Sequence, residues 1–321
     1  MKTRRTYELK PLFLERMSSL LGKEMQNYLD ILDKPLQNSI RCNTLKISPE
    51  ELLTRLNSKG WEVSQPFELY PEIMTIKNEL SPGELGRSME HLLGYYYVQE
   101  IASMLPVLAL RPKSGELVLD LAAAPGSKTT QLAAAMKNTG TIIANDVNIG
   151  RLKILASNME RCGVANSILV KKDGISLCKK LKESGFQFDK ILVDAPCSGE
   201  GTLRSSDATA KMWNPKTIKN LSRLQKGLLA SAIEIMKPDG EAVYSTCTHS
   251  PEENEGVIDF ILKKFGNNVS IEKISLPVKC RPGIGKWLDH DYDKNIEKSC
   301  RIYPQDNDTE GFFIAKLRKI K

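Results

Sequence analysis

The sequence has few residues of the kinds that build metal or disulfide sites. It contains three histidines, at positions 91, 249 and 290, and no two of its seven cysteines stand at the CxxC or CxxxxC spacing that holds zinc. The number of cysteines is also odd. We therefore predict neither a metal site nor a disulfide framework. A Cys/His dyad of the protease type has no support from the sequence, although it stays open.

Long apolar runs are missing as well. No segment approaches the roughly 18 consecutive apolar residues of a membrane span. The basic start Met1–Arg5 is not followed by an apolar core, so we expect no signal peptide. Hydrophobic residues make up 41% of the chain and charged residues 26%, which is ordinary for a folded, soluble protein. We expect a monomeric cytoplasmic protein without membrane contact.

The 321 residues are enough for about two domains. Residues 1–88 contain short segments broken by prolines and predict a small α/β domain, with a strand over 40–46 and a helix whose N-cap is Ser48. Residues 89–321 form the larger domain, which is entered through an apolar helix over 101–110. We interpret the three tyrosines at 95–97 as packing between the domains rather than as a surface for stacking bases.

From residue 117 onward, buried strands alternate with helices. This alternation predicts an α/β fold with a mostly parallel sheet that is covered by helices on both faces. The predicted strands are 117–120, 141–145, 167–170, 190–193 and 242–245. The clearest predicted helices are 128–136, 150–161 and 218–236.

Acidic residues stand at or just past the ends of four of these strands, where open parallel sheets bind ligands. After Asp120, the small residues Ala122, Ala123, Ala124, Pro125, Gly126 and Ser127 lead through Lys128 into a helix and allow backbone to approach a ligand closely. Asp146 comes 20 residues after Gly126, where an acid can accept hydrogen bonds from ribose hydroxyls. Asp173 can reach an adenine amino group, and Asp194 follows the next strand. The pattern predicts a nucleoside-type cofactor.

Two better-known phosphate-binding loops do not fit this segment. A P-loop has glycine directly before its lysine, whereas Ser127 stands between Gly126 and Lys128. The dinucleotide pattern GxGxxG is absent too. Any one of these acids could simply be a solvated residue at the end of a strand. Four of them at one edge of the sheet favour a ligand-binding site.

Two cysteines, Cys197 in Asp-Ala-Pro-Cys and Cys247 in Ser-Thr-Cys, follow strands at this same edge. A single cysteine at a strand end is more often a small buried apolar residue. Carbon 5 of cytosine, however, accepts a methyl group only after a thiolate has added to carbon 6, and an acid such as Asp194 can support ring nitrogen 3. Ser250-Pro251-Glu252-Glu253 is typical of a capping box, which predicts a helix start whose positive end favours the thiolate.

These stretches resemble the Sun-type (Nol/Nop/Sun) family of RNA cytosine-5 methyltransferases, and in layout the archaeal tRNA-modifying members. The resemblance covers about residues 41–317. Its matching segments are 41–46, 96–106, 120–130, 194–204, 244–255 and 311–315. It implies a Rossmann-like sheet that binds S-adenosylmethionine, with a small N-terminal domain of the RNA-recognition type.

The resemblance also implies roles for individual residues. Cys247 would be the nucleophile, and Cys197 would assist release of the methylated RNA. Contacts to S-adenosylmethionine would come from residues 122–128, Asp146, Asp173 and Asp194. The family usually has cysteine where Ala122 stands and glycine where Ser127 stands. Both replacements are small, so we expect binding and activity to be kept.

Three alternatives remain at this point. DNA cytosine-5 methyltransferases carry their nucleophile in a Pro-Cys pair like Pro196-Cys197, which would exchange the two cysteine roles. The substrate, expected to be tRNA, could be ribosomal RNA. The chain could also be a catalytically idle RNA-binding factor on the same fold. The net charge of +7 suits an RNA partner, and the whole excess of basic over acidic residues lies in residues 91–321. We interpret the basic residues at 316–321 as a solvated tail.

Overall fold

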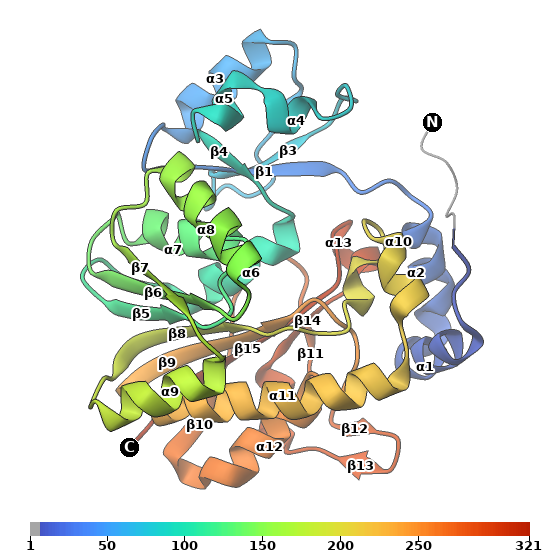
Figure 1. Cartoon of the computed structure of the whole chain (residues 1–321). Coiled ribbons are helices and arrows are strands. Elements are labelled where there is room, and N and C mark those ends of the chain that lie inside the picture. The colour runs from blue at the N-terminus through green and yellow to red at the C-terminus, as the bar shows by residue number, and fades with distance from the viewer. Residues whose placement is uncertain (1–6) are drawn as a thin grey trace.

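The computed structural model describes residues 7–321, so the start at which no signal peptide was expected lies outside the described part. Two sheets organise the described chain (Figure 1). The smaller one has the strand order β2-β3-β1-β4, and all its pairs are antiparallel. Its strands are β1 (Asn38–Cys42), β2 (Val63–Ser64), β3 (Ile73–Ile76) and β4 (Tyr96–Val98).

The small N-terminal domain forms around this sheet. Ser48 caps α3 (Pro49–Ser58) by accepting a hydrogen bond from the Glu51 N–H, as the sequence predicts. The predicted strand over 40–46 ends earlier, because the chain turns at Asn43. β4 pairs with β1 although it lies past the boundary predicted at residue 88. Two short helices complete the domain, α4 (Glu84–Arg87) and α5 (Met89–Leu92).

The larger sheet has the order β11-β14-β15-β9-β8-β5-β6-β7, with β10 also pairing with β15. The strands from β9 to β7 are parallel, whereas β15 runs antiparallel to β9. The predicted fold class is therefore confirmed, with an added antiparallel side. The parallel strands are β5 (Leu117–Asp120), β6 (Thr141–Asp146), β7 (Ser167–Lys171), β8 (Phe188–Asp194) and β9 (Met236–Thr246). The others are β10 (Val269–Glu272), β11 (Arg281–Pro282), β14 (Cys300–Ile302) and β15 (Phe312–Lys319), while β12 (Lys286–Trp287) and β13 (His290–Asp291) form a separate hairpin.

Helices cover both faces of the large sheet (Figure 1). Each layer buries its own apolar cluster against the strands. One face carries α6 (Ile101–Leu110), α7 (Ser127–Ala135) and α8 (Ile149–Cys162), and the other carries α9 (Gly174–Glu183), α11 (Pro215–Glu234) and α12 (Glu255–Phe265). No helix within residues 7–321 is long and apolar enough to cross a membrane.

The first two helices pack against the large domain rather than against the small sheet. Phe13 and Tyr28 belong to an apolar cluster with Leu203, Trp213 and Tyr303. The Phe13 and Trp213 rings meet edge to face with centroids 5.4 Å apart. The first two helices are therefore packed apart from the small sheet. The elements of this region are α1 (Pro11–Leu21), α2 (Met25–Leu32), α10 (Asp207–Met212) and α13 (Pro304–Asn307).

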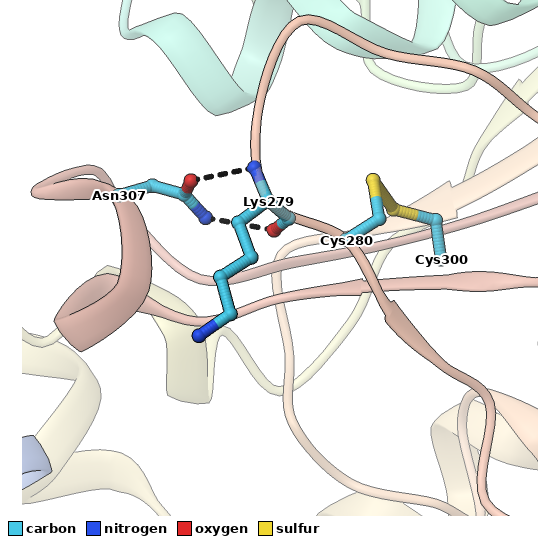
Figure 2. The surroundings of a disulfide bond; sticks show 4 residues. All are labelled: Lys279, Cys280, Cys300 and Asn307. Carbon is cyan, nitrogen blue, oxygen red and sulfur yellow. Dashed lines mark hydrogen bonds between the residues drawn. A yellow bond between two sulfur atoms is a disulfide. The ribbon is translucent and has the colours of Figure 1, made fainter.

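A disulfide joins Cys280, just before β11, to Cys300 in β14 (Figure 2). Asn307 holds the neighbouring backbone, since its side chain accepts from Lys279 N at 2.8 Å and donates to Lys279 O at 3.0 Å. We predicted no disulfide framework, and this single bond corrects that prediction in part. The two cysteines are 20 residues apart, and only the pairing of β11 with β14 brings them together.

Candidate active site

The ends of the parallel strands bring three of the four predicted acids to one edge of the sheet. Asp120, Asp146 and Asp194 are the last residues of β5, β6 and β8. Because β8 lies between β5 and β9, Asp194 stands opposite Ser245 in the register. Asp173 follows β7 but is exposed, and it caps α9 by accepting a hydrogen bond from Ser176 N at 2.9 Å.

The loop from Ala122 to Gly126 turns tightly between β5 and α7. Gly126 has φ 109°, a conformation that disfavours any residue with a side chain, and an added Cβ would lie 2.8 Å from the Leu155 side chain. The peptide bond between Ala124 and Pro125 is cis. Ala123 and Ala124 are buried, so small side chains keep the loop close to the sheet edge.

The N-terminal domain contacts the first turn of α7, directly after this loop, through Arg41, a residue to which the sequence analysis assigned no role. The buried guanidinium donates to Ser127 O at 2.7 Å and to Thr130 Oγ1 at 2.8 Å, and it also bonds Gln99. Tyr97 packs between Arg41 and Arg161, 5.6 Å from each, which confirms the interpretation of this tyrosine as interdomain packing. In the sequence, the one indication of a role for Arg41 is its position at the start of a segment that matches the family pattern.

Lys128 and Asp194 form an ion pair inside the site. Lys128 Nζ lies 2.7 Å from Asp194 Oδ2 and 3.0 Å from Ser103 Oγ. The second oxygen of Asp194 accepts a hydrogen bond from Ser245 Oγ at 2.7 Å. The carboxylate is thus held in one orientation, with 27% of its side chain exposed at the sheet edge. Held in this way, it can accept a hydrogen bond from a protonated ring nitrogen or an amino group.

The expected cofactor fits the unused hydrogen-bonding capacity at this edge. Asp146 is 2% exposed, and its Oδ1 accepts from Asn148 N at 2.9 Å. Its Oδ2 faces Arg151 at 3.1 Å but accepts no hydrogen bond within residues 7–321. Buried carboxylate oxygens are normally hydrogen-bonded, so this one can take a ribose hydroxyl of S-adenosylmethionine.

Burial makes the neighbouring Asp120 unusual. It raises the pKa of this carboxyl to about 7, against the lowering effect of a hydrogen bond from Thr129 Oγ1 at 2.8 Å. The charge of Asp194 adds to the rise. Asp120 therefore titrates near neutral pH at the base of the loop.

The two predicted cysteines lie in contact. Cys197 Sγ is 3.3 Å from Cys247 Sγ, although the residues are 50 positions apart. This contact, followed by burial and by the charge of Glu253, raises the pKa of the Cys197 thiol well above its usual range. Cys197 therefore remains a thiol and can donate its proton toward the sulfur of Cys247.

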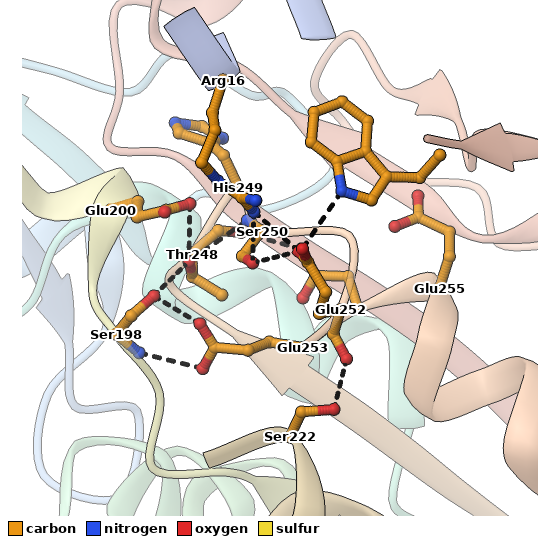
Figure 3. A network of polar contacts seen from close by, with 12 residues as sticks. Arg16, Ser198, Glu200, Ser222, Thr248, His249, Ser250, Glu252, Glu253 and Glu255 are labelled. Atoms are coloured by element: carbon orange, nitrogen blue, oxygen red, sulfur yellow. Dashed lines mark hydrogen bonds and ion pairs between the residues drawn. The ribbon is translucent and has the colours of Figure 1, made fainter. Parts of the chain in front are cut away.

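Hydroxyl and carboxyl groups tie the two cysteine loops together (Figure 3). Ser198 Oγ is 2.7 Å from Thr248 Oγ1, and Ser198 N donates to Glu253 Oε2 at 3.0 Å. The same carboxyl accepts from Gln225 Nε2 of α11 at 2.8 Å. Burial raises the pKa of Glu253 to about 7. These bonds link the residues directly after each cysteine and so set the separation of the two sulfurs.

The capping box predicted at residues 250–253 is wrong. α12 begins at Glu255, and Glu253 turns to Ser198 instead of capping a helix. Asn254 binds the end of β9, accepting from Thr246 Oγ1 at 2.6 Å and donating to Thr248 O at 2.9 Å. A positive helix end next to Cys247 is therefore not available.

Close backbone packing supports the Cys247 loop. Gly201 N donates to Cys247 O at 2.9 Å, and Gly311 N donates to Gly201 O at 2.9 Å. A Cβ at Gly201 would lie 2.2 Å from Gly311 O. A Cβ at Gly311 would lie 2.2 Å from the His249 ring, so neither position has room for a side chain, and both glycines stand in segments that matched the family pattern.

His249 does not act as the base of a cysteine dyad. Its ring stacks on Tyr303 with centroids 5.1 Å apart and meets Tyr28 edge to face. Burial lowers the pKa of His249 to about 3, so the ring is neutral. No group of three or more histidine, cysteine or acidic side chains in residues 7–321 is arranged to hold a metal ion.

The chain is similar to known RNA methyltransferases along most of its length. A family described as 16S rRNA methyltransferase RsmB/F matches residues 107–318, and the N-terminal domain of 16S rRNA methyltransferase RsmF matches residues 9–101. Ribosomal RNA small subunit methyltransferase F of Vibrio parahaemolyticus is 41% identical over 96% of this chain, which spans 62% of that relative's length. The tRNA (cytosine(49)-C(5))-methyltransferase of Pyrococcus abyssi is 42% identical over 95% of each chain.

Solved structures agree with the sequence relatives. A methyltransferase homolog from Pyrococcus horikoshii has a TM-score of 0.84 and 37% identity, covering 98% of this chain and 96% of its own. NSun6 from the same organism, solved with SFG, has a TM-score of 0.83 and 28% identity, covering 97% of this chain and 98% of its own.

Proposed function

Because the chain belongs to the RsmB/F family of S-adenosylmethionine-dependent RNA cytosine-5 methyltransferases, the family predicted from its sequence, we propose that it methylates carbon 5 of a cytosine in RNA. The observation that carries the proposal is the contact of two cysteine sulfurs, 3.3 Å apart, at the sheet edge that also bears Asp194. S-adenosylmethionine supplies the methyl group when it is bound.

We assign the nucleophile to Cys247. Its thiolate forms a bond to carbon 6 of the cytosine, which moves electron density to carbon 5. The raised pKa of Cys197 supports this assignment, because a thiol that keeps its proton is a poor nucleophile. The alternative in which Cys197 attacks requires a thiol whose pKa is raised to lose its proton first.

Asp194 and Cys197 complete the proposed reaction. The carboxylate, fixed between Lys128 and Ser245, accepts a hydrogen bond from the amino group on carbon 4, and from ring nitrogen 3 once that nitrogen has taken up a proton. Carbon 5 uses the electron density placed on it to form the bond to the methyl group. Loss of the carbon 5 proton to a base then breaks the bond between carbon 6 and Cys247. Cys197 lies next to that bond and assists the release.

For the cofactor, we assign the ribose hydroxyls to Asp146 and the backbone contacts to residues 122–128. Lys128 contributes only its backbone to these cofactor contacts, because its ammonium group forms an ion pair with Asp194. Asp173 stays a predicted contact to the adenine. Its Oδ1 caps α9, and its second oxygen has no hydrogen bond within residues 7–321, so it can accept one from the adenine amino group.

The RNA class has two candidates. We favour tRNA, on the similarity to the Pyrococcus abyssi enzyme named for cytosine 49 of tRNA. Ribosomal RNA is supported by the match of residues 9–101 to the N-terminal domain of RsmF and by the Vibrio relative. Bisulfite sequencing of total RNA from cells with and without the gene separates the two, since the cytosine that loses protection identifies the substrate.

Turnover tests the proposal as a whole. Purified protein, tritiated S-adenosylmethionine and total RNA should yield 5-methylcytosine in the RNA after nuclease digestion. An idle RNA-binding factor would bind RNA but transfer no label, and that result would contradict the proposed activity.

A further inference from the structure

A cavity that has no part in the candidate active site lies away from the carboxyl edge of the sheet. Its volume is about 870 Å³, and it opens between α1, α11, α12 and the β12–β13 hairpin. None of the residues assigned to methyl transfer lines it. The mechanism proposed above leaves it without a role.

One wall of this cavity is a row of positive charges on α11. Lys219, Arg223 and Lys226 follow each other at helical spacing and share one face. Lys219 and Arg223 are exposed and have no hydrogen-bond or ion-pair partner within residues 7–321. Lys226 is half-buried beside the Phe260 ring, 5.8 Å from its centroid. The charges of this wall are therefore available to an anion.

The opposite wall is apolar and partly open. Phe260 of α12 is 38% exposed and Leu288 of the hairpin is 66% exposed. Trp287 lies beneath them, donating to Glu252 Oε1 at 3.2 Å. A flat ring facing a row of cations matches single-stranded nucleic acid, which offers planar bases and regularly spaced phosphates.

The acids of the cavity do not cancel this charge. Glu252 is paired with Arg16 at 2.8 Å, and Asp259 is paired with Lys263 at 2.6 Å. The remaining acid, Asp289, sits at the exposed tip of the hairpin. Once these pairs are formed, the cations of α11 dominate the field inside the cavity.

The same helix supports the catalytic loops. Ser222 Oγ donates to Glu252 O at 2.6 Å, and Gln225 Nε2 donates to Pro196 O at 2.8 Å. Glu252 thus lines the cavity and lies five residues after Cys247. A chain bound along α11 would be held at a fixed position relative to both cysteines.

We propose that this cavity binds a single-stranded segment of the substrate RNA away from the target cytosine. Phosphates would lie along Lys219, Arg223 and Lys226, and one base would stack on Phe260. The inference rests on the proposed function, because it takes the occupant to be the RNA that is methylated. An acidic peptide would satisfy the cations but would not need a flat ring.

Matched variants of the full chain test this assignment. The first, Lys219→Gln with Arg223→Gln, removes two charges from the cavity. Its control, Lys113→Gln with Lys137→Gln, removes two exposed charges just before β5 and β6, at the opposite end of the strands. The third variant, Phe260→Leu, keeps an apolar side chain but removes the flat aromatic ring on which a base could stack. The probe is a fluorescein-labelled single-stranded RNA of about 20 nucleotides and mixed sequence, titrated at several salt concentrations.

The cavity double variant should bind this RNA about tenfold more weakly than wild type, and its slope of log affinity against log salt should fall by about 1.4, for two lost phosphate contacts. Phe260→Leu should weaken binding about fivefold at an unchanged salt slope. The control should match wild type. Equal affinities for the cavity and control double variants would overturn the proposal, and full affinity in Phe260→Leu would overturn the stacking of a base on Phe260.

Methyl transfer to total RNA, measured on the same wild-type preparation, separates this inference from the proposed function. If wild type transfers methyl groups but the cavity variants bind RNA as tightly as wild type, the cavity assignment alone is contradicted. Cavity-dependent binding without methyl transfer would support the cavity and contradict the proposed activity.

Discussion

The two halves of the candidate active site are held together in different ways. The cofactor half consists of one short loop and the acids at neighbouring strand ends, and Asp146 keeps a buried oxygen without a hydrogen bond. In the cysteine half, Ser198, Thr248 and Glu253 use their polar atoms on one another. The open acceptor of Asp146 can receive a hydrogen-bonding ligand, whereas the bonds among Ser198, Thr248 and Glu253 hold the two sulfurs at a set distance.

The largest effect should come from the two cysteines, because they perform chemistry that no neighbour can replace. Cys247→Ala should abolish methyl transfer and the covalent RNA adduct. Cys197→Ala should still attack and transfer the methyl group, then accumulate RNA attached through Cys247. Denaturing gels with labelled RNA measure the adduct.

The double cysteine variant serves as the control and should form no adduct. Thermal melting of each variant must stay near that of wild type for the comparison to hold. An adduct that persists in Cys247→Ala but disappears in Cys197→Ala would reverse the two roles and favour the arrangement of DNA methyltransferases.

Asp146→Ala should affect the cofactor half alone. We expect S-adenosylmethionine affinity to fall by about 10- to 100-fold, because one hydrogen bond to a charged group is lost, worth about 1.5–3 kcal/mol. RNA affinity should change little. Calorimetry with each ligand measures both, and an unchanged cofactor affinity would rule out the assigned ribose contact.

Glu253 makes the cysteine half sensitive to pH. Its folded pKa of about 7 lies above the ordinary value of a glutamate, so the folded protein binds this proton more tightly than the unfolded chain. The contribution to stability is present at low pH and is lost as pH rises through about 7, by on the order of 3 kcal/mol as an upper bound.

Glu253→Gln should remove this dependence. Urea unfolding from pH 5 to pH 8 should show the variant gaining stability relative to wild type as pH rises. Asp120 and Glu310, whose pKa values burial also raises to about 7, remain in both proteins and act as an internal reference. Parallel curves for variant and wild type would refute a protonated Glu253.

The smallest effect should come from Thr248→Val, which removes one hydroxyl but keeps the shape of the side chain. The variant loses the 2.7 Å contact to Ser198 and the 3.1 Å hydrogen bond to Glu200. We expect a loss of about 1–2 kcal/mol in unfolding free energy. Methyl transfer should slow severalfold while cofactor affinity stays at the wild-type value, and an equal loss of both would mean that the halves are not independent.

Local patterns in the sequence were enough for much of the architecture. The strand predicted at 117–120 is β5, and the strands predicted at 141, 167 and 190 fall within β6, β7 and β8. The helix predicted from 218 begins three residues earlier, at Pro215 behind its N-cap Asn214. The tail predicted to be solvated is instead β15, where Lys316 pairs with Glu241 at 3.0 Å. A strand that carries several charged residues is hard to tell from a solvated tail by its sequence, because only its pairing with β9 and β10 distinguishes the two.

The sequence by itself determined the family, the presence of a mostly parallel sheet, and the strand-end positions of Cys197, Cys247, Asp146 and Asp194, because these depend on periodicity and short motifs. The domain boundary at residue 88, the monomeric state and residence in the cytoplasm stay predictions. Tertiary structure alone decided the contact of the two sulfurs, the hydrogen bond between Ser198 and Glu253, and the hydrogen bond from Arg41 to Ser127. Each of these joins residues at least 50 positions apart, and their approach is set by strand register and helix packing, which no local pattern encodes.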